Sequence, residues 1–136
     1  MPRTFRSNSE METSDLGRAL ASTLKPGAVV LLVGDLGTGK TSFVRGLAAG
    51  LGIDPDAVSS PTFMLVQAYH GQRTLFHVDL YRLEGGEPED LGLEELASGD
   101  AIVAIEWAEK LVHPFPDAVQ VRIVDTGDNT RDITIE

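Results

Sequence analysis

The sequence of 136 residues contains no cysteine and is poor in basic side chains. The absence of cysteine excludes disulfides and thiolate-bound metals within these residues. No apolar run approaches the roughly 20 residues that a membrane-spanning helix requires, and the N-terminal segment lacks the apolar core of a signal peptide. We therefore expect one cytoplasmic domain over residues 1–136, with no membrane association.

The charge balance is strongly acidic. Lysine and arginine number 11 against 21 aspartate and glutamate residues, which gives a formal net charge of −10. A protein that binds nucleic acid directly gains affinity mainly from a basic face that neutralises phosphates, and this balance argues against such a face. The acidity indicates either that the chain serves RNA through a protein partner or that it simply maintains solubility.

The strongest pattern present is an apolar run, a glycine-rich turn and an amphipathic segment in residues 28–52, AVVLLVGDLGTGKTSFVRGLAAGLG. Its centre, GDLGTGKT at 34–41, fits the phosphate-binding motif G-x-x-x-x-G-K-[ST] at every required position. Gly34, Gly37 and Gly39 have no Cβ, so consecutive backbone N–H groups can approach a polyphosphate closely. The motif therefore predicts a nucleotide-phosphate site.

The flanking segments agree with this interpretation. Residues 28–33 are apolar and β-branched, and apolar residues recur every fourth position from Phe43 to Leu51. The loop is thus expected to lie between a strand and a helix whose positive dipole end faces the phosphates. In that context Lys40 is expected to reach the terminal phosphates, and the Thr41 hydroxyl is expected to bind a magnesium ion.

The remaining patterns predict further elements around this unit. In chain order they are a helix at 9–24 with an S-x-x-E capping box and a stop at Lys25-Pro26-Gly27, a hairpin at 63–80, a short helix at 87–98, a buried strand at 101–105 and a C-terminal antiparallel hairpin at 117–135, placed at a sheet edge. The predicted fold class is α/β: a P-loop NTPase-like three-layer sandwich, whose mixed sheet has a parallel centre and antiparallel hairpins.

Two of the predicted strands finish in a carboxylate. Asp79 closes the second strand of the first hairpin, and Glu106 follows the buried strand. Since an open α/β sheet binds its ligand at the carboxyl ends of its strands, Asp79, Glu106 and Thr41 are predicted to hold magnesium and position water. The spacing leaves open which carboxylate is the nearer metal ligand.

Other residues near these motifs allow two interpretations each. His77 alternates with Asp79 and is expected on the same strand face, where it either orients that carboxylate or is a buried structural histidine. Thr62 lies where other phosphate-loop proteins have switch loops, or in a plain turn. Arg82 either stabilises phosphoryl charge or pairs with an acidic surface, and Trp107 either guards the site or packs at its rim.

Four motifs together resemble the TsaE family, the small ATPases of bacterial tRNA threonylcarbamoyladenosine synthesis. They are GDLGTGKTSFVRG at 34–46, SSPTF at 59–63, HVDLYRL at 77–83 and IEW at 105–107, in order and at suitable spacing. The resemblance implies a Mg²⁺-dependent ATPase that works with two larger partner proteins, TsaB and TsaD, and acts on tRNA only indirectly.

The resemblance also implies roles for individual residues. Thr41 and Glu106 match the magnesium ligands of the family, and Asp79 matches the acidic residue of its HxDLYR motif, to which we assign water or metal positioning. Lys40, Asp79 and Glu106 are thus the expected catalytic set. The residues expected at the ATP are Gly34, Gly37, Thr38, Gly39, Lys40, Thr41, Ser42 and Thr62 at the phosphates, and Glu10, Thr130 and Arg131 towards the base.

Three other functions use the same loop. A small-molecule phosphotransferase needs an acceptor pocket and usually a basic lid, and no arginine-rich segment of that kind is present. A GTPase would need N-K-x-D, whereas residues 129–132 read NTRD and lack the lysine. A non-catalytic module, in which ATP only holds a partner-binding conformation, remains an alternative.

Overall fold

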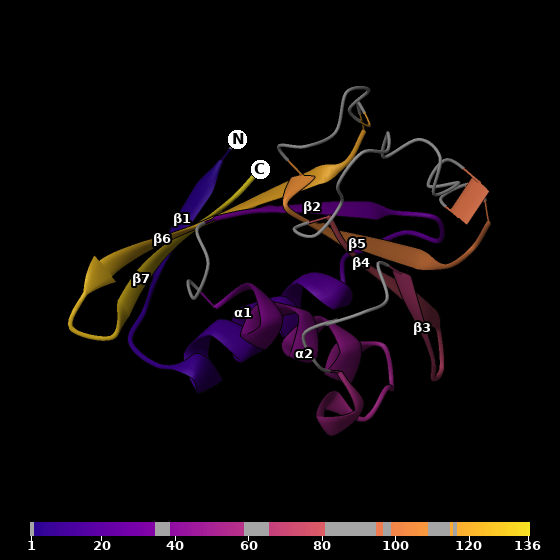
Figure 1. Cartoon of the computed structure of the whole chain (residues 1–136), viewed down its shortest axis with the longest axis horizontal. Coiled ribbons are helices and arrows are strands. Elements are labelled where there is room, and N and C mark those ends of the chain that lie inside the picture. The colour runs from indigo at the N-terminus through magenta and orange to yellow at the C-terminus, as the bar shows by residue number, and fades with distance from the viewer. Residues whose placement is uncertain are drawn as a thin grey trace.

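The computed structural model of the chain describes residues 2–34, 39–58, 66–80, 95–96, 99–108, 115 and 117–136. In this part of the chain, one seven-stranded sheet has the order β1-β7-β6-β2-β5-β4-β3, and two α-helices lie along one of its faces (Figure 1). The elements are β1 Arg3–Ser7, α1 Glu10–Ala21, β2 Val29–Val33, α2 Lys40–Gly50, the 3-10 helix η1 Pro55–Ala57, β3 Val66–His70, β4 Thr74–Asp79, β5 Ile102–Glu106, β6 Val119–Gly127 and β7 Thr130–Ile135.

The sheet has the predicted mixed pairing. Its centre is parallel, because β2 pairs with β5 and β6, and β5 also pairs with β4. The flanks are antiparallel, through the pairs β3–β4, β6–β7 and β1–β7. The apolar run of β5 is buried along its whole length, as expected for a strand covered on both faces. The predicted α/β fold with a parallel centre and antiparallel hairpins is confirmed.

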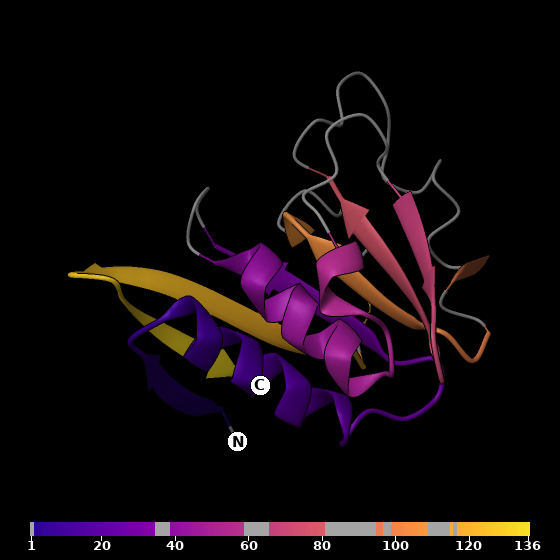
Figure 2. The same ribbon diagram turned by 90° about the horizontal axis from the view of Figure 1, so that it is seen from below.

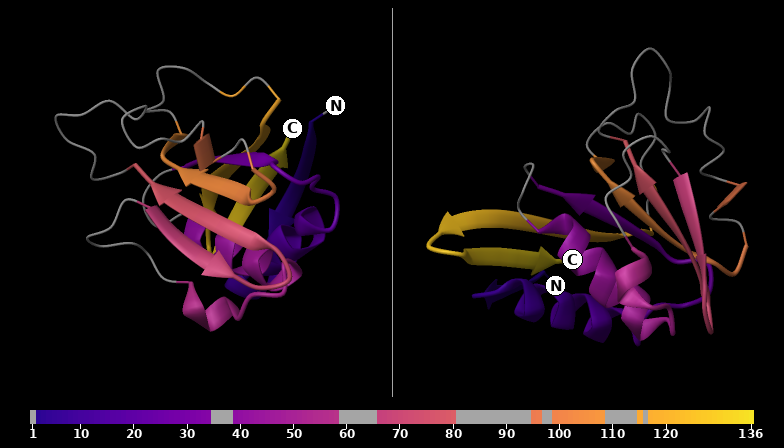
Figure 3. Two further views of the ribbon diagram at one scale, coloured as in Figure 1. Left: turned by 90° about the vertical axis from the view of Figure 1, so that its right-hand side faces the viewer. Right: turned by 60° about the horizontal axis from the view of Figure 1, so that its bottom comes forward.

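One predicted position in the sheet is wrong. The C-terminal hairpin β6–β7 is antiparallel but does not lie at a sheet edge, because β6 pairs with β2 and β7 pairs with β1. The edge is formed instead by β1, whose sequence RTFRS is mostly polar and gave no strand signal. β1 is held by its backbone pairing with β7, which a side-chain pattern does not reveal. Figure 3 shows the hairpin projecting past the parallel strands on the side where α2 begins.

The first helix begins as predicted and ends earlier. The Ser9 side chain accepts a hydrogen bond from the Glu12 N–H at 3.0 Å. The helix stops at Ala21, ahead of the predicted stop at Lys25. Just after that end, the Thr23 hydroxyl donates to a carbonyl of the last turn at 2.8 Å. Such a hydroxyl donates a hydrogen bond to a carbonyl that would otherwise accept from the N–H of a further helical turn. The helix therefore ends before Pro26 is reached.

Glycines allow α1 and α2 to pack closely side by side (Figure 2). A Cβ on Gly17 would lie 2.2 Å from the Phe43 carbonyl oxygen, and one on Gly46 would lie 1.7 Å from the Ser14 carbonyl oxygen. The backbones therefore approach at a distance that only glycine permits at these two positions. No helix in the described residues is long and apolar enough to span a membrane.

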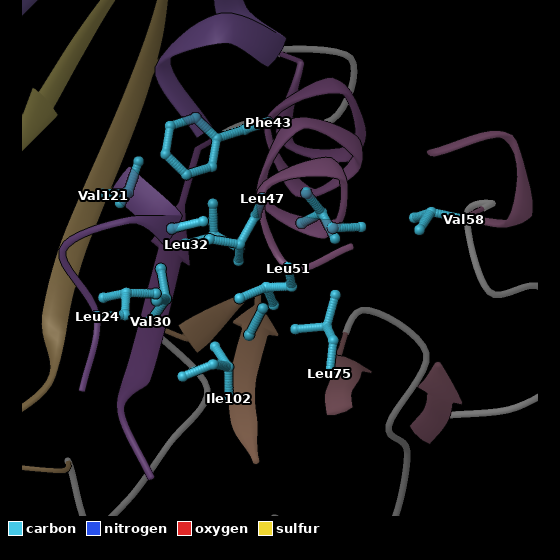
Figure 4. Packing of buried hydrophobic residues seen from close by; sticks show 14 of the residues in the cluster. Leu24, Val30, Leu32, Phe43, Leu47, Leu51, Val58, Leu75, Ile102 and Val121 are labelled. Carbon is cyan, nitrogen blue, oxygen red and sulfur yellow. The ribbon is translucent and has the colours of Figure 1, made fainter. Parts of the chain in front are cut away.

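Buried apolar residues form one cluster on each face of the sheet. Between the sheet and the helices lie Phe43 and Leu47 of α2 and Leu51 just after it, the every-fourth residues that the sequence pattern predicted to be buried (Figure 4). The opposite cluster includes Val78 and Ile105 and packs against further apolar residues, which include Leu96, Trp107, Phe115 and Ala118. Both faces of the parallel centre are thus covered, which leaves the carboxyl ends of the strands as the place for a polar site.

Candidate functional site

Two predicted site residues meet at the carboxyl edge of the parallel strands. In the register of β4 and β5, Asp79 lies directly beside Glu106, and Glu106 in turn lies beside Leu32 near the end of β2. Side chains alternate along a strand, so Asp79 shares the face of buried Leu75, which packs towards the helices. The two carboxylates therefore end on the side of the sheet from which α2 begins.

The start of α2 has the backbone form that an anion site needs. Gly39 is its N-cap, with φ of 106°, in the left-handed region that favours glycine. Glycine has no side chain to cap the helix, and the first turn contains no acidic residue. A helix start with this backbone form and no side chain at its N-cap is a common place for an anion to bind. Lys40 and Thr41 follow directly in the first turn, and Ser42 is buried there.

The Lys40 side chain, at the start of α2, contacts the backbone at Gly34, where the phosphate-loop motif begins. The side chain is only 5% exposed, and Nζ donates to the Gly34 carbonyl oxygen at 2.5 Å. The same ammonium lies 3.7 Å from the ring centroid of Trp107, at a distance typical of a cation–π contact. Trp107 itself has φ of 60°, which costs energy for a bulky residue. This residue at the end of β5 is therefore held in a strained conformation beside the loop lysine.

Glu106 is held by a histidine. It is 3% exposed, and its Oε2 is hydrogen-bonded to Nε2 of His77, which is fully buried. His77 shares its strand face with Asp79, as the alternation predicted. The structure nevertheless pairs its ring with Glu106, on the neighbouring strand, so the interpretation that it orients Asp79 finds no support in the contacts described.

Among the residues expected near the nucleotide base, Arg131 lies closest to the loop. A Cβ on Gly39 would lie 3.4 Å from Arg131 Nε and 3.8 Å from Thr13 Cγ2. Thr130 instead donates to the Gly127 carbonyl within its own hairpin turn at 2.5 Å, and Glu10 is exposed in the first turn of α1. Sequence reasoning missed Thr13, because its position on a helix gave no sign of which element it would face.

Some predicted residues fall outside the described part of the chain. Gly37, Thr38 and Thr62 belong to these, as do Arg82 and most of the predicted helix at 87–98. Their expected roles stay predictions.

Two hollows, of about 490 and 760 Å³, lie at the amino ends of the parallel strands, near the starts of β2 and β4. They are remote from the edge at which the charged residues meet.

The oxygen donors at the site suit a magnesium ion that is completed by other ligands. The described residues contain no group of three or more histidine, aspartate or glutamate side chains placed to hold a metal by themselves. Mg²⁺ usually takes one or two carboxylates and fills its remaining positions with water and phosphate oxygens. Glu106 and Asp79 at the strand ends and Thr41 in the first turn of α2 are the oxygen donors that could serve as ligands of such an ion.

Comparison with known proteins gives a consistent result. The model of one family, described as "Threonylcarbamoyl adenosine biosynthesis protein TsaE", matches residues 7–133. A protein of that name from Treponema pallidum is 40% identical over 131 residues, covering 95% of this chain and 96% of the relative. One from Bacillus subtilis is 42% identical over 132 residues, covering 96% and 82%. The crystal structure of Bacillus subtilis YdiB matches with a TM-score of 0.78 at 32% identity, over 99% of this chain and 84% of that one.

Proposed function

The chain belongs to the TsaE family of tRNA threonylcarbamoyladenosine biosynthesis proteins, and on that premise we propose that it hydrolyses ATP with Mg²⁺ to support this modification. It acts through partner proteins of the TsaB and TsaD type and reaches tRNA only through them. Hydrolysis is slow in the isolated chain, because the partners supply part of what the reaction needs.

One observation carries the proposal. Lys40, Asp79 and Glu106 come from three separate segments of the sequence; Asp79 lies beside Glu106 in the register of β4 and β5, and the Lys40 ammonium lies over the ring of Trp107, which follows Glu106. A buried lysine at a glycine-capped helix start offers positive charge and backbone donors to a polyphosphate. Two adjacent carboxylates offer oxygen atoms to a cation and to a water molecule. These are the parts that a phosphate-loop ATPase requires.

Each residue has a role in this scheme. Lys40 neutralises charge on the terminal phosphates, and Thr41 with Glu106 holds the metal. Asp79 orients water, either directly or through the metal. Bound Mg²⁺ would supply charge stabilisation to the phosphates during transfer. Arg131 contacts the nucleotide from the β7 side in this scheme, a role that its position against Gly39 supports.

The experiment that tests this function measures ATP turnover of the purified chain in three settings: alone, with TsaB and TsaD homologues, and with a panel of small-molecule phosphate acceptors. We expect slow turnover alone and a changed rate with the partners. The Lys40→Ala variant serves as the control and should lose turnover by about 100-fold or more, since a charge that acts on the transferring phosphoryl group is removed.

The other outcomes identify the alternatives. Transfer of phosphate to an added acceptor would show a phosphotransferase. Nucleotide binding without turnover, with or without partners, would show a non-catalytic module. Turnover that persists at the same rate in Lys40→Ala would show that the site lies elsewhere.

A further inference from the structure

We propose that His77 is a positioning residue for Glu106, which it holds in the orientation that the site uses. Its Nε2–H is donated to Oε2 of the carboxylate, and this leaves Oε1 to be presented at the carboxyl edge of the sheet. The inference deepens the proposed function and rests on it for the task that Glu106 performs. The residue itself does not touch the nucleotide.

The geometry of the two strands sets up this contact. His77 lies opposite Ala104 in the parallel register of β4 and β5, while Glu106 lies opposite Asp79, two residues further on. The His77 ring therefore reaches Glu106 diagonally, from the interior of the sheet towards its edge. Both side chains lie on the helix-covered side, where Leu75 and Ala104 belong to the buried cluster.

Burial decides which nitrogen carries the proton. His77 is 0% exposed, and its Nδ1 has no hydrogen-bond partner among the described residues. With hydrogen on Nδ1, the buried Nδ1–H would have no acceptor and the Nε2 lone pair would face a carboxylate oxygen, so neither nitrogen would make a favourable contact. The tautomer with hydrogen on Nε2 avoids this cost, and it donates to the carboxylate oxygen that lies against it.

Packing alone does not explain a polar pair at this position. His77 follows buried Leu75 on the same strand face, so an apolar side chain of similar volume would fill the space. Replacing buried polar or charged pairs by apolar residues is often neutral or stabilising, because the desolvation of both groups is avoided. The pair therefore adds something besides stability, and its geometry points to the orientation of Glu106.

The neighbouring carboxylate makes such orientation necessary. Asp79 lies directly beside Glu106 at the carboxyl ends of β4 and β5, and two adjacent negative charges repel each other. The His77 donor on the interior side of Glu106 restricts rotation of the carboxyl group and keeps it from turning out into solvent. Partners of this kind behind a metal-binding side chain typically contribute about 10- to 100-fold in metal affinity or activity.

Two substitutions separate the donated hydrogen from the bulk of the ring. His77→Gln keeps an N–H donor on a side chain of similar reach, and His77→Leu keeps apolar volume without a donor. We expect His77→Leu to lose about 10- to 100-fold in kcat and in Mg²⁺-dependent nucleotide affinity, with metal-free affinity unchanged. We expect His77→Gln to restore most of both. Leu75→Val, on the same face of the same strand, is the matched control and should lower stability without lowering kcat.

A spectroscopic measurement tests the proposal without reference to activity. The chain has three histidines, so a long-range ¹H–¹⁵N correlation spectrum of the nucleotide-free protein shows signals from three rings. The signals that disappear in the His77→Gln variant belong to His77. We expect the His77 ring to show the Nε2–H tautomer. This readout also remains available if His77→Leu does not fold.

Three results would overturn the inference: the Nδ1–H tautomer at His77, a His77→Leu variant that keeps its kcat and Mg²⁺-dependent affinity, or a His77→Gln variant that loses as much as His77→Leu. Failure of the proposed function looks different. In that case the unaltered chain lacks ATP turnover under every condition, while Mg²⁺-dependent nucleotide affinity and the tautomer still report on His77 and Glu106.

Discussion

Glu106 and Asp79 are neighbours at the carboxyl ends of β5 and β4, yet their surroundings differ. Glu106 is almost fully buried and has a histidine donor behind it, whereas Asp79 is partly exposed. A carboxylate whose orientation is fixed in this way suits direct coordination of an ion, because it loses little freedom on binding. The more exposed Asp79 is better suited to orient water. This difference favours Glu106 as the nearer metal ligand, a choice that spacing alone left open.

The assignment predicts the behaviour of a Glu106→Ala variant. Removing the carboxylate should weaken Mg²⁺-dependent nucleotide binding by about 10-fold or more, because an oxygen ligand is lost. Metal-free binding should change far less, since it depends on Lys40 and the start of α2. Titration of a fluorescent nucleotide analogue, with Mg²⁺ and with a chelator, measures both affinities. Glu106→Gln, which keeps the size of the side chain, is the matched control. An equal loss in both titrations would assign Glu106 a structural role instead.

The motif spacing predicted several site residues, and the remaining contacts depend on three-dimensional register. The places of Asp79 and Glu106 at strand ends were predicted correctly, since each follows a clear apolar pattern, and their roles stay predictions. The pairing of His77 with Glu106 could not, because a diagonal contact depends on how β4 and β5 align. Arg131 was expected near the base only by resemblance, and its approach to Gly39 follows from the path of the C-terminal hairpin.

At the scale of elements, the position of α2 depends on its contact with α1. The buried residues of α1 are small, Thr13, Gly17 and Ala21, while Leu16 and Leu20 are partly buried and pack against the core cluster. The backbone of Ser14 in α1 lies so close to Gly46 in α2 that there is no room for a Cβ at position 46. The close approach fixes how α2 lies against the sheet, and therefore where its glycine-capped start points.

A Gly46→Ala variant tests this packing. A Cβ would lie 1.7 Å from a backbone oxygen of α1, so the helices must move apart. We expect a loss of about 2 kcal/mol or more in the free energy of unfolding, because overpacking outweighs the roughly 1 kcal/mol gained in helix propensity. Chemical denaturation measures the change. Gly99→Ala is the control, since a Cβ there would meet nothing within 4 Å, and it should leave stability nearly unchanged. Equal stability in both variants would contradict the packing described.

The element predictions succeeded where one apolar face determines the structure. α2, β5 and the β3–β4 hairpin have strong periodic or continuous apolar patterns, and each was found close to its observed bounds. β1 was missed because its side chains are mostly polar and exposed, so its sequence has no apolar face, and its pairing with β7 uses the backbone and exposed polar side chains. Without β1 the sequence suggested an edge position for the C-terminal hairpin, so a single missed strand caused the error in sheet order.

At the scale of the whole molecule, the basic side chains are few, and several are used internally. The chain has 11 lysine and arginine residues against 21 acidic ones. Arg73 donates to the Leu24 carbonyl oxygen and Arg45 to that of Val58, each at 3.0 Å. Arg6 pairs with Asp132 at 3.2 Å. Guanidinium groups engaged in this way are less available to neutralise phosphates, which adds to the unfavourable net charge.

This distribution of charge predicts that the isolated chain does not bind tRNA appreciably at physiological salt. We expect a Kd weaker than about 100 µM, the weak end of non-specific binding by proteins that do carry a basic face. Fluorescence anisotropy of labelled tRNA measures the affinity, first with the chain alone and then with TsaB and TsaD homologues present. If the partners hold the RNA, adding the chain should change the anisotropy of labelled tRNA in the presence of the partners and leave it unchanged in their absence. Tight binding by the chain alone would contradict the prediction, and a steep fall of that affinity with salt would show that a basic face contacts phosphates directly.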